Sequence, residues 1–221
     1  MESYLIIVIS LDNDPKAHAD IRQDVLDFQV SQLGGRVVDL VWASPPCTNY
    51  SNARRKTNGT EEELESSDQL VEKALSIAEE LKCPIFVENP WTGRLKTREL
   101  LDHLYAHRVD YCKYGMPYRK RTAIWTDTEW KPKRALCAHD CPATLDGKHI
   151  ARAQQGGPGP RFTQRQLYVI PAELCEEIAL WFTPKKDERS PRSTSAGRTN
   201  SSARHAWGGS CSTQMLPQTA E

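Results

Sequence analysis

The sequence predicts an α/β fold built on a doubly wound, mostly parallel sheet. The first observation is a pair of continuous apolar runs, Tyr4–Leu11 (YLIIVISL) and Val37–Ala43 (VVDLVWA), which are rich in Ile and Val like strands buried on both faces. The second is that segments with helical spacing alternate with such runs, as in chains that form parallel sheets. The 221 residues suit one domain with a substantial core.

The boundaries of the next elements come from capping and proline residues. Thr60 and Glu63 have the form of a capping box, and apolar residues then recur at helical spacing as far as Leu81, which predicts a helix that Pro84 ends. Ile85–Val87 is a short third strand. The other expected elements are a short helix at Thr97–Leu104, strands at Val109–Cys112 and Arg121–Thr126, and a final amphipathic helix at Ala172–Phe182.

Composition divides the chain into a folded part and a tail. Residues 1–182 are predicted to form one domain with a small insert at 127–160, and residues 183–221, poor in apolar residues, to be a disordered tail. The 29 basic and 29 acidic residues balance, so overall charge gives no argument for a nucleic-acid or membrane partner. The sequence shows neither a membrane span nor a secretory signal, and its seven cysteines lack disulfide-framework spacing. We therefore expect an intracellular protein, in the cytoplasm, the nucleus or a viral host cell.

Polar stretches follow three of the predicted strands, where α/β proteins gather their ligands. These stretches are DNDP (12–15), SPPC (44–47) and VENP (87–90). In SPPC, Pro45 and Pro46 fix the backbone and direct Cys47 into the crevice at the strand end. Glu88 directly follows an apolar strand, where partial desolvation favours a protonated carboxyl, so a thiolate and an acid are predicted to meet. Two plainer interpretations stay open: Cys47 is a buried structural cysteine, and Glu88 caps a helix or pairs with an arginine.

These residues resemble the C5-cytosine DNA methyltransferases, particularly compact, phage-type members. The family nucleophile lies in a Pro-Cys motif and its cytosine-binding glutamate in a Glu-Asn motif, similar to SPPC and VENP. The similarity is collinear from about residue 4 to residue 182. The further matching stretches are VISLDNDP (8–15), ADIRQDV (19–25), YRKRTAIW (118–125), RFTQRQ (161–166) and IPAELCEEIA (170–179).

The resemblance implies a role for each matched residue. The expected activity is transfer of a methyl group from S-adenosylmethionine to C5 of cytosine in DNA, through a covalent cysteine adduct with a base flipped out of the duplex. The implied catalytic residues are Cys47, Glu88, Arg119 and Arg121. The implied cofactor-binding residues are Asp12, Asp14, Asp24 and Pro45, and the implied substrate-binding residues are Ser44, Pro46, Asn89 and Pro90.

The chain departs from the family pattern in three places. No Gly-rich cofactor turn precedes the first acidic strand, so the methyltransferase-type sheet is expected to lack its first strand. Thr48 follows Cys47 where the family usually has glutamine, and only about 35 residues separate Trp125 from Arg161, so the usual target-recognition domain is absent. An RNA-directed cytosine-C5 methyltransferase and a catalytically inactive nucleic-acid-binding relative therefore stay open as alternatives.

Two features of the sequence suggest partners. The basic groups ARRK (53–56), YRKR (118–121) and KPKR (131–134) could hold the phosphates of DNA bound by a monomer. In the insert, Cys137, Cys141 and His149 are candidate ligands of a structural zinc ion, with His139 or Cys112 as the fourth ligand. The alternative is a loop with unremarkable cysteines.

Overall fold

The computed structural model describes residues 7–51, 60–151, 153 and 160–182, which lie within one compact unit, Met1–Thr183. The predicted tail at 183–221 lies outside the described residues, so the expected domain boundary stays a prediction. None of the helices in the described ranges is both long and apolar enough to cross a membrane.

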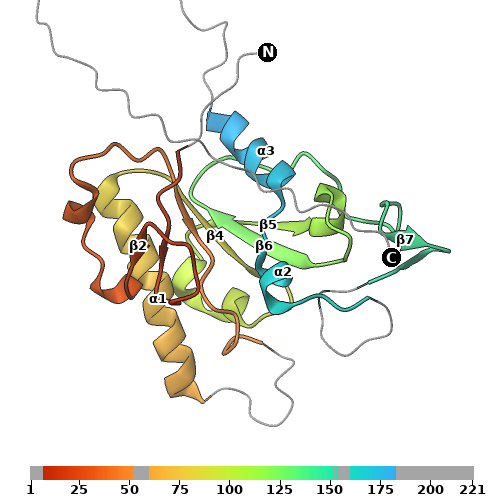
Figure 1. Cartoon of the computed structure of the whole chain (residues 1–221), viewed down its shortest axis with the longest axis horizontal. Coiled ribbons are helices and arrows are strands. Elements are labelled where there is room, and N and C mark those ends of the chain that lie inside the picture. The colour runs from red at the N-terminus through yellow and green to blue at the C-terminus, as the bar shows by residue number, and fades with distance from the viewer. Residues whose placement is uncertain (1–6, 52–59, 152, 154–159, 183–221) are drawn as a thin grey trace, which may run out of the picture. The chain divides into compact units, whose positions relative to one another are not determined.

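A four-stranded mixed sheet forms the centre of the unit (Figure 1). Its strands are β3 (Val41–Ala43), β4 (Ile85–Pro90), β5 (Tyr105–Asp110) and β6 (Arg121–Thr126), in the order β3-β4-β6-β5. β3 and β4 are parallel, whereas β6 runs antiparallel to both of its neighbours, β4 and β5. The architecture is therefore α/β, as predicted, with one reversed strand inside the sheet.

Alternation along β4 separates two apolar cores on opposite faces of the sheet. Ile85 and Val87 pack with Val71 and other residues of helix α1 (Glu61–Leu81), and Phe86 packs with Leu174 of helix α3 (Ala172–Phe182). Successive side chains of a strand point to opposite faces, so the two helices cover different sides of the sheet (Figure 1).

Helix α1 confirms the prediction made from its capping box. The Thr60 hydroxyl accepts from the Glu63 amide and the Glu63 carboxylate accepts from the Thr60 amide, which satisfies two free N–H groups of the first turn. The helix ends at Lys82, which has positive φ, and β4 starts at Ile85. The predicted strand at Arg121–Thr126 and the predicted helix at Ala172–Phe182 are also confirmed.

The N-terminal prediction is wrong over its described part. The only strand there is β1 (Leu11–Asp12), paired in parallel with β2 (Ile21–Arg22), while Ile7 and Val8 are 80% and 71% exposed. Val37 is likewise 90% exposed, and β3 begins only at Val41. Both strands were predicted from apolar composition alone. In the structure, however, Ile7, Val8 and Val37 lie outside the strands of the described residues and are exposed. Two 3₁₀ helices, η1 (Val25–Asp27) and η2 (Val30–Leu33), complete this region.

Short 3₁₀ helices follow β4 and β5. The predicted helix at Thr97–Leu104 is two 3₁₀ turns, η3 (Leu95–Thr97) and η4 (Glu99–Leu101). The strand predicted at Val109–Cys112 is β5, which ends at Asp110 and passes into the 3₁₀ helix η5 (Tyr111–Tyr114). Helix α2 (Gln164–Tyr168) precedes α3.

The insert at 127–160 has a small amount of regular structure. Its strands β7 (Thr144–Leu145) and β8 (Lys148–His149) form a hairpin, and its fully buried Trp130 packs edge-on against Phe86 of the main sheet. The insert is therefore anchored to the domain through an aromatic contact.

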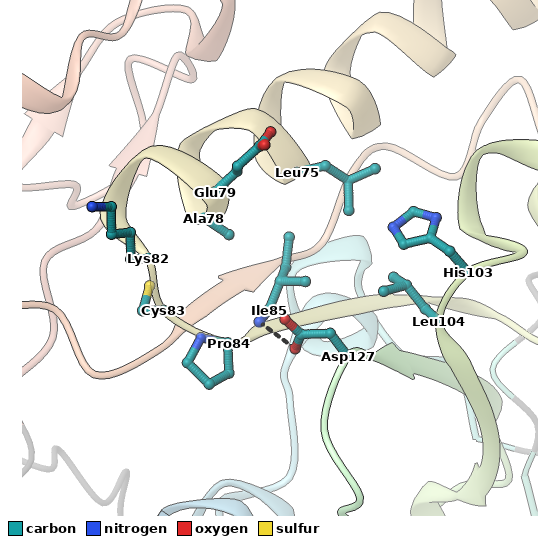
Figure 2. A pocket seen from close by; sticks show the side chains of 10 residues that line it. All are labelled: Leu75, Ala78, Glu79, Lys82, Cys83, Pro84, Ile85, His103, Leu104 and Asp127. Atoms are coloured by element: carbon teal, nitrogen blue, oxygen red, sulfur yellow. Dashed lines mark hydrogen bonds between the residues drawn. The ribbon is translucent and has the colours of Figure 1, made fainter.

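A surface cavity of about 580 Å³ lies at the start of β4 (Figure 2). Leu75 and Ala78 of α1 line it together with Ile85, whose amide donates to Asp127 Oδ1 across 3.0 Å. Glu88 lies at the opposite end of the same strand, so we do not assign this cavity to the candidate active site described below.

Candidate active site

The loop after β3 carries Cys47 and is fixed to the neighbouring strand. Ala43 pairs with Val87, so Ser44 and Glu88 are the next positions along two parallel strands. Asn89 Nδ2 donates to the carbonyl of Pro45 across 2.9 Å, and Trp42 Nε1 donates to Ser44 Oγ, also across 2.9 Å. Since prolines 45 and 46 restrict the backbone further, the position of Cys47 depends on the exit of β4 as well as on its own strand.

Glu88 is buried, and two hydrogen-bond donors meet its carboxylate. The Tyr111 hydroxyl donates to Glu88 Oε1 across 3.1 Å, and Lys120 Nζ lies 3.3 Å from the same oxygen. The side chains of Lys120 and Glu88 are only 13% and 7% exposed, so the ion pair is largely removed from water. Lys120 also lies over the Tyr111 ring, 4.8 Å from its centroid.

The thiol of Cys47 is within electrostatic reach of this ion pair. Burial raises the pKa of Cys47 above its ordinary value, while the positive charge of Lys120 lowers that pKa and the negative charge of Glu88 raises it. The side chain is half-buried, so the sulfur is neither sealed in the core nor freely exposed. We call these four residues the base pocket: Cys47, Glu88, Tyr111 and Lys120.

Lys120, rather than Arg119 or Arg121, is the cation beside Glu88. Glu88 pairs with Ile124, so Lys120 and Ile124, an even number of residues apart, share the Glu88 face of β6 and its extension. Arg121 is exposed, and Arg119 Nε lies 3.7 Å from Asp110 Oδ1. The sequence alone did not predict Lys120 or Tyr111. Alternation puts Lys120 on the other face from Arg119 and Arg121, but only the pairing of Glu88 with Ile124 shows which face Glu88 shares.

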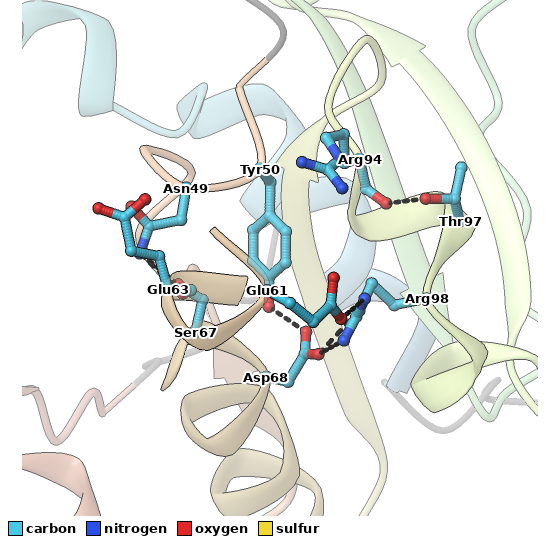
Figure 3. Close-up of polar contacts among 9 residues, drawn as sticks. All are labelled: Asn49, Tyr50, Glu61, Glu63, Ser67, Asp68, Arg94, Thr97 and Arg98. Atoms are coloured by element: carbon cyan, nitrogen blue, oxygen red, sulfur yellow. Dashed lines mark hydrogen bonds and ion pairs between the residues drawn. The ribbon is translucent and has the colours of Figure 1, made fainter. Parts of the chain in front are cut away.

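A polar network holds the residues that follow Cys47 (Figure 3). The hydroxyl of fully buried Tyr50 donates to Asp68 Oδ1 across 2.8 Å, and the Arg98 guanidinium contacts Asp68 Oδ2 and Glu61 Oε1. The Tyr50 carbonyl accepts from the Arg94 amide across 2.7 Å. The Cys47 loop is therefore tied to helix α1 and to the segment after β4.

The predicted cofactor residues lie at or just after the ends of β1, β2 and β3. Asp12 and Asp14 are exposed; each carboxylate accepts one backbone amide of its own loop, from Asp14 and Lys16 respectively. Their exposed oxygens fit the hydroxyls of a ribose, because a carboxylate oxygen can accept several hydrogen bonds. Asp24 instead caps η1 by accepting the Leu26 amide, and Pro45 contributes its carbonyl to Asn89.

The predicted metal ligands do come together, and Cys112 completes the set. The ligand atoms of Cys112, Cys137, Cys141 and His149 all lie within 4.8 Å of one another, and the three cysteines are buried. His139 contacts the His149 ring with its own ring, at a centroid distance of 4.8 Å, and is outside the set.

The three basic groups differ in what is described of them. The group ARRK (53–56) lies outside the described residues. In YRKR, Lys120 pairs with Glu88 and Arg119 with Asp110, and in KPKR the Arg134 guanidinium contacts Glu173. Because these three basic side chains are paired with acidic ones, fewer cations are available to bind phosphates than the basic groups of the sequence suggest.

The fold and this arrangement define a class of protein. A thiol and a buried carboxylate with a paired lysine, at the ends of neighbouring strands of an α/β sheet, are suited to an enzyme that attacks its substrate with a nucleophile. No protein-family model matches the chain.

Comparison with curated proteins identifies the particular family. A probable DNA (cytosine-5)-methyltransferase of Frog virus 3 (isolate Goorha) is 35% identical over 182 residues, which cover 73% of this chain and 84% of the viral protein. The chain therefore belongs to the DNA (cytosine-5)-methyltransferase family, as its sequence motifs predict.

Proposed function

We propose that the chain transfers a methyl group from S-adenosylmethionine to C5 of cytosine in DNA, with Cys47 as the nucleophile. The observation that supports this most directly is the buried ion pair of Lys120 Nζ and Glu88 Oε1, 3.3 Å apart, whose two charges both act on the Cys47 thiol. Family membership supports the reaction and the cofactor. We also propose that the fold is the doubly wound methyltransferase architecture without its first strand.

The proposed chemistry needs these side chains in this place. Cytosine C5 is a weak nucleophile, and addition of the Cys47 thiolate to C6 forms a carbon–sulfur bond and moves the C5–C6 π electrons toward C5. S-adenosylmethionine, when bound, supplies the electrophilic methyl group. The C5 proton then passes to solvent, its bonding electrons restore the C5–C6 double bond, and the bond from C6 to sulfur breaks, which frees the Cys47 thiolate.

Glu88 and Lys120 act on the pyrimidine ring in this proposal. The Glu88 carboxyl binds at N3 of the cytosine, where negative charge develops during addition. The Lys120 ammonium lies 3.3 Å from Glu88 Oε1 and supplies a positive charge and an exchangeable proton there. Asn89 and Pro90, with Ser44 and Pro46, shape the walls of the pocket. We retain Arg119 and Arg121 as contacts to DNA: Arg121 is exposed and could reach a phosphate, whereas Arg119 would first have to leave Asp110.

The remaining assignments follow from the reaction. The target cytosine must leave the duplex stack to reach a half-buried thiol, so we propose base flipping by a monomer acting on DNA within a cell. Asp12 and Asp14 hold the ribose of the cofactor, with Asp24 and Pro45 nearby in the same site. A structural zinc ion at the Cys₃His cluster is the second proposed cofactor, at a site separate from the base pocket.

Trapping on a modified substrate tests the proposal. Wild-type protein with S-adenosylmethionine should form a stable covalent complex with DNA that contains 5-fluorocytosine, because fluorine cannot leave C5 as a proton does. Cys47→Ser should abolish both this complex and methyl transfer, whereas Cys83→Ser, at the far end of β4, should keep both. Full activity of Cys47→Ser would refute the nucleophile, trapping on RNA alone would favour the RNA alternative, and no affinity for S-adenosylmethionine would favour the inactive relative.

A further inference from the structure

The cluster of Cys112, Cys137, Cys141 and His149 has the dimensions of a tetrahedral metal site. The three sulfur atoms lie 3.4, 3.3 and 3.4 Å from His149 Nε2 in that order. Around zinc, with bonds of about 2.3 Å to sulfur and about 2.0 Å to nitrogen, a tetrahedral angle puts each sulfur about 3.5 Å from the nitrogen. All three sulfurs therefore lie at nearly the correct distance from one imidazole nitrogen.

The cluster joins parts of the chain that local structure does not bring together. Cys112 lies in η5 after strand β5, Cys137 and Cys141 lie in the first part of the insert, and His149 ends the β7–β8 hairpin. Three buried thiols and one imidazole thus surround a single point, and the thiols with Ala143 make up the small core at this place. Zinc would satisfy all four groups at once, with release of three thiol protons to solvent.

The cluster is linked to both partners of Glu88, directly to Tyr111 and through Asp110 and Arg119 to Lys120. Cys112 directly follows Tyr111, and the Tyr111 amide donates to the Lys120 carbonyl across 3.0 Å. The cluster thus has a covalent connection to the Tyr111 side of the base pocket.

A second connection runs to the Lys120 side through a buried ion pair. Asp110 Oδ2 accepts the Cys137 amide across 3.0 Å, and Asp110 Oδ1 lies 3.7 Å from Arg119 Nε. Arg119, which precedes Lys120, also donates to the Cys137 carbonyl across 3.4 Å and exchanges two backbone hydrogen bonds with Ala151 and Ala153 at the end of the insert.

We propose that Cys112, Cys137, Cys141 and His149 bind one zinc ion, and that this ion fixes Tyr111 and Lys120 in position against Glu88. The four ligands are then positioning residues for the base pocket, which they do not touch. The positioning role rests on the proposed methyl-transfer function, whereas zinc binding itself does not.

Zinc binding is tested without activity. The purified full chain should contain one zinc per chain by elemental analysis, and cobalt substituted for zinc should give the visible bands of a tetrahedral thiolate site. Cys137→Ser should lose zinc and the rise in unfolding temperature that zinc loading gives, Cys137→His should keep both by supplying an imidazole, and Cys83→Ser should match wild type. A wild-type chain that holds no zinc and gives no tetrahedral cobalt spectrum overturns the proposal, whatever its methyl transfer.

The positioning role is tested on the same variants. Loss of groups that orient an active centre from outside commonly lowers activity by about 10- to 100-fold, and we expect a loss of this size in covalent trapping by Cys137→Ser, with rescue in Cys137→His. Affinity for S-adenosylmethionine should be unchanged, since the predicted cofactor residues lie elsewhere. Full trapping by a zinc-free Cys137→Ser overturns the positioning role. A wild-type chain that binds zinc but never traps DNA would instead refute the methyl-transfer proposal and leave the metal site standing.

Discussion

Replacement of Lys120 by methionine should destabilise the fold and slow methyl transfer. Lys120 Nζ and Glu88 Oε1 are 3.3 Å apart, and at an effective dielectric constant of about 20 their attraction is about 5 kcal/mol. Removing one partner of a buried ion pair typically costs about 3–5 kcal/mol, because the other charge is left without compensation. Tyr111 still donates to Glu88, so we expect the lower end, about 3 kcal/mol.

Thermal unfolding measures this loss directly. For a chain of this size about 1 kcal/mol changes the midpoint by roughly 2–4 °C, so Lys120→Met should unfold about 6–12 °C below wild type. Lys113→Met is a matched control, since Lys113 pairs with Asp140 at the surface and should leave the midpoint nearly unchanged. The double variant Lys120→Met with Glu88→Gln should regain most of the lost stability, because no buried charge is then unpaired. A Lys120→Met midpoint within about 2 °C of wild type would show that the pair is solvated, and the electrostatic reasoning would then fail.

Two further predictions concern the thiol and the loop that carries it. Burial raises the pKa of Cys47 and the charge of Lys120 lowers it, so the rate of methyl transfer should rise with pH above neutrality. This rise should move to higher pH in Lys120→Met and to lower pH in Glu88→Gln, which remove a positive and a negative charge near the thiol. Identical pH–rate profiles in all three proteins would contradict the assignment of Cys47 as the nucleophile. Tyr50→Phe removes a buried hydrogen bond to the charged Asp68 and should lower the free energy of unfolding in urea by about 1.5–3 kcal/mol, with reduced trapping at Cys47. An unchanged urea midpoint would show that the network in Figure 3 does not stabilise the Cys47 loop.

Local signals predicted the elements that local interactions stabilise. Helix α1 follows from Thr60, Glu63 and the spacing of its apolar residues, all of which act within a few turns. The N-terminal strand was overpredicted, because an apolar run shows that burial is favourable but not that a partner strand exists. Ile7 and Val8 have that composition and are exposed.

Local signals also predicted part of the candidate site, whereas the rest depends on tertiary packing. Cys47 and Glu88 come after apolar runs, so their place in or beyond the second half of two strands could be predicted from the chain, although β4 continues past Glu88 to Pro90. Which of three consecutive basic residues faces Glu88 depends on the register of β4 with β6, which no single segment encodes. The fourth member of the metal cluster was similarly undecided between His139 and Cys112, because only the packing of the insert on η5 brings Cys112 to His149.

The reversed strand explains how a lysine reaches a pocket made at strand ends. β3 and β4 are parallel, so both deliver their carboxyl-end residues, Cys47 and Glu88, to one edge of the sheet. β6 runs in the opposite direction, and the residue before its first position, Lys120, therefore lies at that same edge. In this register a cation that precedes β6 neutralises a carboxylate of β4, whose charge and that of the cation both act on the Cys47 thiol.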